Sequence, residues 1–412
     1  MSQQGPIIVV SSGEKLSFST ALSETKMFPV IDVIWPEASR AVEGLQPAAM
    51  LVSASDETEP WLQKLAAQVA AQQPYVPLLV INPKKPLPAN GIPFSQVAGS
   101  IDRLSARLRA ALRVRTLHAT VLRRLADDST VRMRQPDTDP VDDATVLLIG
   151  RGAAYPALSV ALGERLGVVG ALSIEAAAKH LNARDLDGIV LGEGFSPRVV
   201  DAFLTVLAED ARFRNLPVVV TVPGVTAAYD LPNLELTSGE PARVAADALP
   251  LIRQHAFEAR LRRALTAIDS DGLLDQRTGL LTRAAFDRDF ATAVFQTASR
   301  GSGLSVARFS FGRIAERVRL DAARILSRLM RRMDFATLLD DGSLIVVFAE
   351  TDLRDAHMIA KRLSSVMKHT MYGPKRDSRI DPHVTLATSL PADSAGSILA
   401  RLYDQDARRV AS

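Results

Sequence analysis

Residues 331–348, RRMDFATLLDDGSLIVVF, decide how the C-terminal part of the chain folds. Asp341-Gly342 stands between two apolar runs, and an Asp-Gly pair in that setting is typical of the tight turn of a β-hairpin. A cation and an acid, Arg331 and Asp334, lie three residues apart just before the first run. The stretch therefore predicts a hairpin. It leaves open whether the polar residues belong to a working site, to the remains of one, or to neither.

The composition of the whole chain limits what such a site can do. The 412 residues are 47% hydrophobic and include 49 Lys and Arg against 46 Asp and Glu, which gives a net charge of +3. This is enough apolar material for two or three globular domains. The charge is too even for a protein that binds nucleic acid by phosphate neutralisation alone. Because no cysteine is present, thiol catalysis, disulfides and thiolate metal sites are excluded.

The N-terminal residues, MSQQGPIIVVSS (1–12), lack the charged start and the long apolar core of a secretion signal. No apolar run approaches the length of a membrane span. We therefore expect a soluble, cytoplasmic protein.

The first 270 residues contain an internal repeat. PIIVVSSGEKLSFSTAL (6–22) and TVLLIGRGAAYPALSVAL (145–162) both place a short apolar strand before a helical pattern. Each copy ends in a long helical stretch with a shared ending, in which His118-Ala or His255-Ala is followed by LRRL or LRRAL. Apolar strands that alternate with helices indicate parallel α/β sheets. The predicted doubly wound domains are residues 1–128 and 144–270, joined by the polar linker 129–143.

These two repeats resemble the receiver domains of response regulators. A working receiver binds Mg²⁺ with acidic residues after its first strand and accepts phosphate on an Asp that ends its third strand. Here VVSSGE (9–14) and MLVSAS (50–55) have serines where the family has carboxylates. The second repeat has Gly192 near the acceptor position and Glu240 where the family has Lys. Without oxygen ligands for Mg²⁺, we expect neither domain to be phosphorylated.

A long helix is predicted at the end of the second repeat. Its apolar positions recur every three or four residues and are Phe257, Leu261, Leu265 and Ile268. Such a stripe can pair with the same helix of a second chain, or it can pack on its own domain. Both alternatives stay open at this point. If the first holds, we expect a homodimer formed through the receiver and stalk helices.

Residues 271–412 resemble the GGDEF, or diguanylate cyclase, domain. LLDQRTGLLTRAAFDRDF (273–290) matches the family pattern DxLTGLxNR, with Thr282 in place of the Asn. The matching residues are Asp275, Thr278, Gly279, Leu280 and Arg283. Residues 331–348 correspond to the turn and hairpin of the GGDEF signature, and HVTLATSLP (383–391) corresponds to a later strand. The resemblance implies a third α/β domain of the nucleotidyl-cyclase type.

The same resemblance implies that cyclase activity is lost. Cyclases of this family join two GTP molecules with carboxylates that hold Mg²⁺ and a glycine turn that admits phosphate. The signature positions here are Asp340, Asp341, Gly342, Ser343 and Leu344. An acid thus replaces the first glycine, and both acidic positions have lost their carboxylates. The strand LSVARFSFG (304–312), where the family has a metal-binding Asp, contains none. We expect no catalytic residue, no metal site and no cofactor; an active cyclase is the enzymatic alternative.

A product-binding element is kept beside the altered signature. In many GGDEF domains an Arg-x-x-Asp element and an arginine on the next helix bind cyclic di-GMP (c-di-GMP). The matching residues are Arg331, Asp334 and Arg362. Guanidinium groups can bind the O6 and N7 edge of guanine or a phosphate, and a carboxylate can accept from guanine N1–H and N2–H. In the alternative interpretation, an isolated Arg-x-x-Asp is a solvated ion pair near a helix end. The adjacent Arg332 is expected to be a surface charge that takes no part in the site.

The resemblance as a whole implies a c-di-GMP receptor that acts through protein contacts. Receptors with this domain order recruit substrates to a protease in cell-cycle control. It therefore implies a protein partner that no motif identifies, such as a protease adaptor or substrate, and recruitment to a cell pole. No nucleic acid and no membrane span are expected. A scaffold that acts without ligand is the structural alternative.

Overall fold

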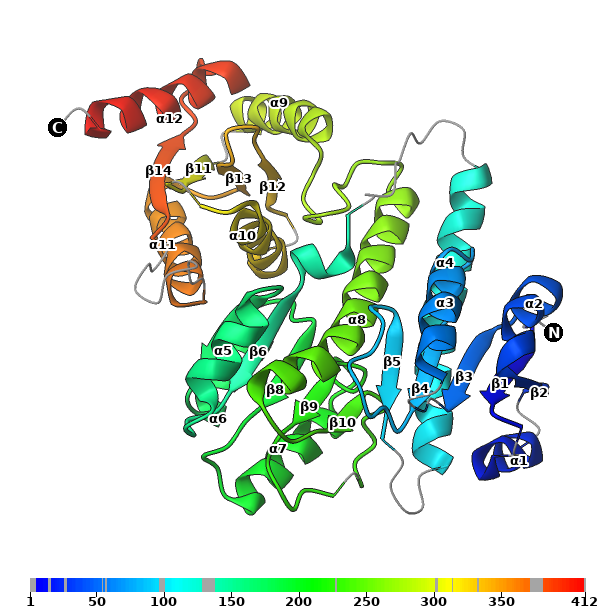
Figure 1. Ribbon diagram of the computed structural model, residues 1–412. Coiled ribbons are helices and arrows are strands. Elements are labelled where there is room, and N and C mark those ends of the chain that lie inside the picture. The colour runs from blue at the N-terminus through cyan, green and yellow to red at the C-terminus, as the bar shows by residue number, and fades with distance from the viewer. Residues whose placement is uncertain are drawn as a thin grey trace. The chain divides into compact units, whose positions relative to one another are not determined.

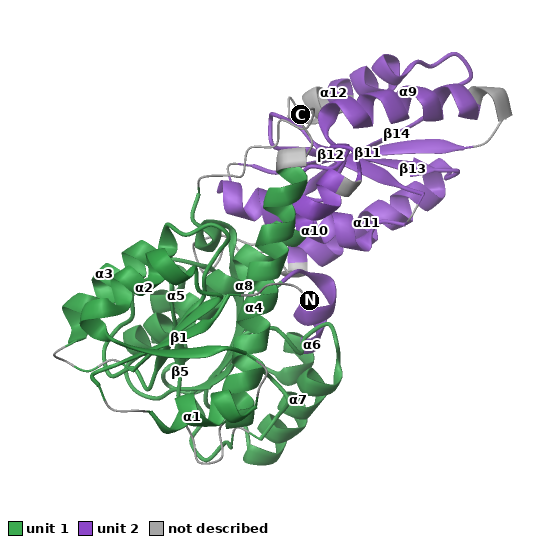
Figure 2. Ribbon diagram, turned by 90° about the vertical axis from the view of Figure 1, so that its right-hand side faces the viewer, with its two compact units in different colours: residues 1–177, 186–262 green, residues 178–185, 263–412 purple. Residues whose placement is uncertain are grey.

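Figure 1 shows a computed structural model of the chain. The structure describes residues 5–410 except 14–15, 26–27, 54, 56–57, 96–100, 128–137, 227, 301–302, 313, 332 and 371–380. The chain divides into two compact units (Figure 2). Unit 1 comprises residues 1–177 and 186–262, and unit 2 comprises residues 178–185 and 263–412. The predicted fold class is confirmed, because two parallel sheets precede a third α/β domain.

The first half of unit 1 is a five-stranded parallel sheet. Its strands are β1 (Ile7–Ser11), β2 (Val30–Ile34), β3 (Ala49–Ser53), β4 (Leu78–Ile81) and β5 (Gly91–Phe94). They lie in the order β2-β1-β3-β4-β5, which is the order of doubly wound receiver-type sheets. Its helices are α1 (Ser17–Glu24), α2 (Trp35–Leu45), α3 (Glu59–Ala70) and α4 (Ile101–Asp127). Strands β1 and β4 are buried along their whole length, as a sheet covered on both faces requires.

The second half of unit 1 repeats this topology. Its strands are β6 (Thr145–Ile149), β7 (Gly167–Ala171), β8 (Gly188–Leu191), β9 (Val218–Val220) and β10 (Leu234–Leu236), in the order β10-β9-β8-β6-β7. Its helices are α5 (Tyr155–Gly163), α6 (Ile174–Ala183), α7 (Pro197–Glu209) and α8 (Pro241–Asp269). Within the predicted linker 129–143, residues 129–137 lie outside the described residues, and Pro140–Asp143 form a 3₁₀ helix.

The last crossover of each sheet contains no helix among its described residues. Residues 82–90 between β4 and β5, and the described part of residues 221–233 between β9 and β10, consist of turns and extended chain. Both connections expose carbonyl oxygens that accept from the opposite half of unit 1. Arg243 of α8 donates to the carbonyl oxygen of Lys84 over 2.9 Å, and Arg107 of α4 donates to that of Pro232. The final helix of each half therefore takes part in joining the two sheets.

A buried ion pair lies at this junction. Arg107 and Glu235 have side-chain exposures of 0% and 2%, and Arg107 Nη2 lies 3.3 Å from Glu235 Oε2. Arg107 also donates to the carbonyl oxygens of Pro93 over 2.7 Å and Leu234 over 2.8 Å. Glu235 Oε1 accepts from the Ser95 amide over 3.0 Å. Each buried charge thus has several partners, as burial of an ion pair requires.

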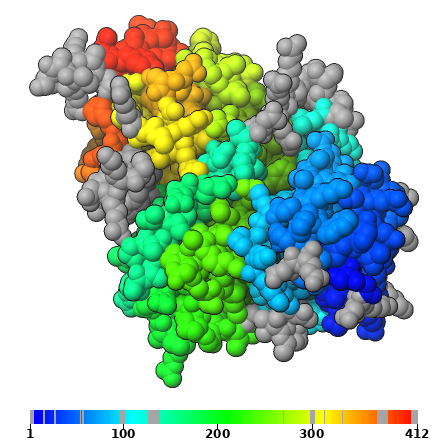
Figure 3. Space-filling view, viewed as in Figure 1, coloured from blue at the N-terminus to red at the C-terminus, as the bar shows by residue number. Residues whose placement is uncertain are grey.

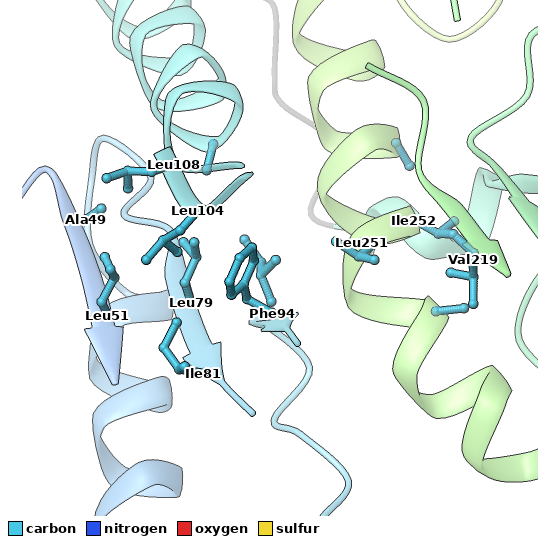
Figure 4. Close-up of a cluster of buried hydrophobic side chains, with 14 of the residues drawn as sticks. Ala49, Leu51, Leu79, Ile81, Phe94, Leu104, Leu108, Val219, Leu251 and Ile252 are labelled. Atoms are coloured by element: carbon cyan, nitrogen blue, oxygen red, sulfur yellow. The ribbon is translucent and has the colours of Figure 1, made fainter. Parts of the chain in front are cut away.

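One hydrophobic cluster extends through both halves of unit 1. Figure 4 shows Leu104 and Leu108 of α4 beside Leu51 and Leu79 of the first sheet. In the same view Leu251 and Ile252 of α8 lie beside Val219 of the second sheet. The space-filling view shows the two halves, coloured blue to cyan and green, side by side (Figure 3).

The apolar stripe of α8 is partly used inside the chain. The ring of Phe257 lies 5.5 Å from that of Tyr75 and 5.2 Å from that of His118, both edge to face. Leu261 is 1% exposed. These two positions therefore fit the alternative in which the stripe packs on its own domain. Pairing of the helices with a second chain stays a prediction.

Unit 2 contains a four-stranded antiparallel sheet between two helical layers. Its strands are β11 (Leu304–Ser310), β12 (Phe335–Leu338), β13 (Leu344–Ala349) and β14 (His383–Thr388), in the order β12-β13-β11-β14. Its helices are α9 (Arg283–Arg300), α10 (Glu316–Leu329), α11 (Leu353–Thr370) and α12 (Ala395–Val410). Apolar residues of α10 and α11 pack with one face of the sheet, and those of α9 and α12 with the other. The predicted hairpin is confirmed as β12 and β13, whose last pair is Leu338 with Leu344.

Within the described parts of both units, no helix combines the length and the apolar character needed to cross a lipid bilayer.

Candidate ligand-binding site

The turn between β12 and β13 contains four of the five signature positions, 340–343, and the fifth, Leu344, begins β13. The Gly342 amide donates to the Leu339 carbonyl oxygen over 2.9 Å, and the Leu339 amide donates to that of Ser343 over 2.8 Å. Gly342 has a φ of +80°, which glycine adopts without strain. A Cβ at this position would lie 2.7 Å from Cδ and Nη1 of Arg319 on α10. Gly342 therefore allows both the turn and the close approach of Arg319.

An arginine on β11 is bonded to this turn. Arg308 Nη2 donates to Asp341 Oδ2 over 2.9 Å, and Arg308 Nε donates to Ser343 Oγ over 3.1 Å. The Tyr403 ring lies 4.5 Å from the Arg308 guanidinium carbon. Burial alone would raise the pKa of Asp341, but hydrogen bonds from Ser343 and the Arg308 guanidinium outweigh it and lower that pKa. Sequence reasoning missed Arg308. The signal that could have found it is its position on the strand where GGDEF domains have a metal-binding Asp.

The residues that match the opening GGDEF pattern stabilise a local turn. Asp275 Oδ1 accepts from the Thr278 amide over 2.9 Å and from Thr278 Oγ1 over 2.7 Å. Gly279, with a φ of +73°, donates its amide to the Asp275 carbonyl oxygen over 2.8 Å. Arg283 forms an exposed ion pair with Asp287 over 2.8 Å. The contacts of these side chains therefore account for the shape of the segment before α9.

The Arg-x-x-Asp element connects α10 to β12. Arg331 is exposed, and its carbonyl oxygen accepts from the Asp334 amide over 3.0 Å, which closes a turn. Asp334 directly precedes β12 and is 7% exposed. Arg362 lies in the middle of α11 with its side chain exposed. Arg332 lies outside the described residues.

The Asp334 carboxylate has no hydrogen-bond partner among the described residues. Both Oδ1 and Oδ2 are buried and unbonded. Burial raises the pKa of Asp334. The backbone amides of Ala349 and Arg331 approach the carboxylate without reaching the geometry of a hydrogen bond, and together with the Arg331 charge they oppose this rise without cancelling it. Arg331 is thus close enough to act on Asp334 electrostatically, although no ion pair joins them. No hydrogen bond or ion pair among the described residues links Arg362 to either residue.

The exposed face of α11 carries more positive charge than the motif includes. Arg354, Lys361 and Arg362 are exposed, and none forms a hydrogen bond or ion pair with the residues that the structure describes. At 100° per residue these three side chains fall within about a third of the helix circumference. Met358, which is 59% exposed, lies on the same face. Helical spacing alone would have identified Arg354 and Lys361 as neighbours of Arg362.

The described residues at the ends of the strands in unit 1 form no acidic cluster. Among the described residues, no group of three His, Asp or Glu side chains is placed to hold a metal ion. Ser11 and Ser53 end β1 and β3, and Gly192 follows β8. The side chain of Glu240, which directly precedes α8, is exposed.

Comparisons with known proteins give only partial likenesses. No family model matches the chain, and no curated protein matches it. The chain is similar to the coiled coil and GGDEF domain of DgcB from Caulobacter crescentus, solved in complex with c-di-GMP. That match has 18% identity, covers 35% of this chain and 84% of the other, and has a TM-score of 0.31.

Two further solved structures are similar over a comparable share of the chain. One is a sensory box/GGDEF family protein from Caulobacter crescentus, with 23% identity over 32% of this chain and 92% of the other and a TM-score of 0.27. The other is the FimX GGDEF domain from Pseudomonas aeruginosa, with 17% identity over 33% of this chain and 94% of the other and a TM-score of 0.29. Likenesses at this level assign neither a family nor an activity to the chain.

Proposed function

We propose that the chain is a receptor that binds c-di-GMP at Arg331, Asp334 and Arg362 and does not synthesise it. The observation that carries the proposal is the Asp334 carboxylate. It is buried, and both of its oxygens lack a hydrogen bond among the described residues. A buried polar group without a partner costs about 1 to 3 kcal/mol or more, so it is seldom kept without a use. The resemblance to GGDEF domains gives this position the role of guanine acceptor.

The groups around Asp334 match the chemistry of the ligand. The ligand has two guanine bases and two negatively charged phosphodiesters. Guanine offers N1–H and N2–H donors to the carboxylate and O6 and N7 acceptors to a guanidinium. Arg331 and Arg362 are both exposed, and neither has an ion-pair partner among the described residues that it would have to leave before it binds. Their charge-assisted hydrogen bonds to guanine or phosphate are the strong type in proteins.

The absence of synthesis is supported by what surrounds Asp341. Its Oδ2 is bonded to Arg308, and its Oδ1 accepts from the Ser343 amide over 2.8 Å. A carboxylate that holds Mg²⁺ on a triphosphate must offer its oxygens to the metal. In this turn the positively charged side chain of Arg308 already lies against the Asp341 carboxylate. We infer that the turn is a structural element of the receptor.

A PopA-like role extends this proposal to partners. The order of two receiver-like domains and one GGDEF-like domain resembles PopA, an alphaproteobacterial receptor that recruits substrates to a protease. In that role the chain relays its ligand state to a protease adaptor or substrate and is recruited to a cell pole. Binding of the full chain to such a partner, compared with and without c-di-GMP, tests this extension.

Isothermal titration calorimetry of the full chain with c-di-GMP tests the central proposal. We expect saturable binding, and weaker binding of cyclic di-AMP, because an adenine edge does not match an ionised carboxylate. Incubation with GTP and Mg²⁺ should give no c-di-GMP. A folded chain that binds no c-di-GMP would favour the ligand-independent scaffold, and GTP turnover would favour the cyclase.

A further inference from the structure

Asp334 differs from the other buried acids of the described chain. Four other acidic residues in the described part of the chain are 9% exposed or less as whole residues, namely Asp187, Glu235, Asp247 and Glu258. Each has at least one hydrogen-bond partner. Glu258, for example, accepts from Arg113, and Asp247 accepts from Thr237. Asp334 is as buried as these groups but has no hydrogen bond at either oxygen.

The environment of Asp334 favours its neutral form in the free protein. Transferring an ionised carboxylate away from water is costly unless partners replace the lost hydration. Among the described residues, Arg331 is the one charged side chain that acts on Asp334, and from β13 only the Ala349 backbone amide does so. Their combined effect is smaller than that of burial, so the pKa of Asp334 lies above its ordinary value.

A bound guanine requires the opposite protonation state. Its N1–H and N2–H groups are both donors, so both carboxylate oxygens must accept. A neutral carboxyl group would direct its own O–H toward one of these donors. Because both oxygens are buried in the free protein, the groups that cover them must move aside when the ligand binds. The ligand would then supply the two hydrogen bonds that the free protein lacks and would stabilise the ionised form.

We propose that binding of c-di-GMP is coupled to the release of a proton from Asp334. This inference rests on the proposed function, since it concerns the same site. The proton passes from the Asp334 carboxyl group to solvent, and the ligand remains unchanged. Asp334 thereby makes recognition of guanine dependent on pH.

The direction of the effect follows from linkage. Binding is strongest at a pH at which Asp334 is already ionised in the free protein. As the pH falls through the raised pKa of the free protein, a growing share of the chain must lose a proton before it binds. The affinity then decreases by up to about tenfold per pH unit, until the ligand-bound carboxylate also becomes protonated. A neutral carboxyl group offers one donor and one acceptor, which suits adenine, so acid should reduce the preference for guanine.

The test is calorimetry of the full chain with c-di-GMP in buffers of different ionisation enthalpy. The slope of observed enthalpy against buffer ionisation enthalpy gives the number of protons released. The titrations are made at about pH 7.5 and at the lowest pH at which the chain stays folded, closer to the ordinary value of an Asp carboxyl group. We expect a proton release at the lower pH, which shrinks toward zero at about pH 7.5. In Asp334→Asn the slope should be zero at both pH values, and the preference for c-di-GMP over cyclic di-AMP should fall by about tenfold or more. Asp355→Asn removes an exposed carboxylate of α11 and should keep the wild-type slope.

The outcomes separate this inference from the function on which it rests. Measurable binding with a slope of zero at both pH values would overturn proton release and leave the receptor proposal standing. A proton release that persists in Asp334→Asn would assign the proton to another group and would also overturn it. If c-di-GMP bound at neither pH, the proposed function itself would be wrong.

Discussion

The guanidinium of Arg308 on β11 is hydrogen-bonded to the carboxylate of Asp341 in the β12–β13 turn, with 2.9 Å between Nη2 and Oδ2. The Arg308 side chain is 10% exposed, and the Tyr403 ring lies against it. A side chain of the strand therefore places a positive charge against the carboxylate of the turn and links the two.

The first prediction concerns catalysis. Purified chain incubated with GTP and Mg²⁺ should give no c-di-GMP above background. Arg308→Asp in addition to Gly342→Glu would remove the guanidinium group from the turn and add two carboxylates. We expect this variant to be inactive too, because a side chain at position 342 strains the turn. Product is measured by chromatography and mass spectrometry. Turnover by the wild type that disappears in Asp341→Ala would show that the turn is catalytic.

The second prediction concerns Gly342. In Gly342→Ala the left-handed backbone costs about 1 to 2 kcal/mol, and contact of the new Cβ with Arg319 adds to this. Urea denaturation should therefore show lower stability than in the wild type. When Arg319→Ala is added to Gly342→Ala, the loss of stability caused by the contact with Arg319 should disappear. The loss caused by the left-handed backbone should remain. If the two changes proved additive in a double-mutant cycle, the close approach would carry no energetic weight.

The third prediction concerns the ligand-binding arginines. Charge-assisted hydrogen bonds are worth about 1.5 to 3 kcal/mol, so Arg331→Ala and Arg362→Ala should each weaken c-di-GMP binding by about tenfold or more. Both side chains are exposed, so the thermal midpoint should barely change.

Arg354→Ala is the matched control for these variants. It removes an exposed arginine that has no partner in the described part of the chain and lies on the same helix, a little over two turns before Arg362. We expect near-normal affinity, measured by calorimetry at fixed salt. Equal losses in Arg354→Ala and Arg362→Ala would mean that the whole α11 face attracts the anionic ligand without a defined site. Unchanged affinity in the double variant Arg331→Ala, Arg362→Ala would contradict the assignment.

Local sequence patterns predicted the helices and strands, whereas the contacts of individual side chains depend on residues far apart in the sequence. Asp341-Gly342 between apolar runs fixed the hairpin, because turn and strand preferences act over a few residues. The bond from Arg308 to Asp341 joins residues 33 apart in sequence, and no local pattern contains it. The pKa of Asp334 likewise depends in part on the Ala349 backbone amide of the neighbouring strand β13. Phe257 of α8 packs on His118 of α4 inside unit 1. The periodicity of the apolar residues alone did not decide between this packing and pairing with a second chain.

The fourth prediction concerns the buried pair of unit 1. Arg107→Met leaves Glu235 buried without its charged partner, and such a change typically costs about 3 to 5 kcal/mol. Urea denaturation should show a large decrease in midpoint. The double variant Arg107→Met, Glu235→Leu removes both charges and should recover much of the loss. A decrease as large in the double variant as in the single one would mean that the carbonyl partners of Arg107, and not the ion pair, dominate.

The fifth prediction concerns His118, which is 6% exposed on α4. Its Nδ1 accepts from the Tyr75 amide over 3.0 Å, so the neutral ring carries its proton on Nε2. Burial and, to a smaller degree, the Arg115 charge lower the pKa of His118 below its ordinary value of about 6.5. Because the unfolded chain then binds a proton more readily than the folded chain, this contribution to stability is complete above about pH 6.5 and is lost as the pH falls below it.

His118→Gln tests this contribution. A glutamine can accept from the Tyr75 amide through its side-chain oxygen, but it does not titrate. Between about pH 7.5 and pH 5, the urea midpoint of the wild type should therefore fall more than that of the variant, and the difference should grow with each step below about pH 6.5. His357→Gln, which changes an exposed histidine of α11, should keep the wild-type pH dependence. Parallel curves for wild type and His118→Gln would mean that protonation of His118 does not disturb the junction of α4, Tyr75 and Phe257.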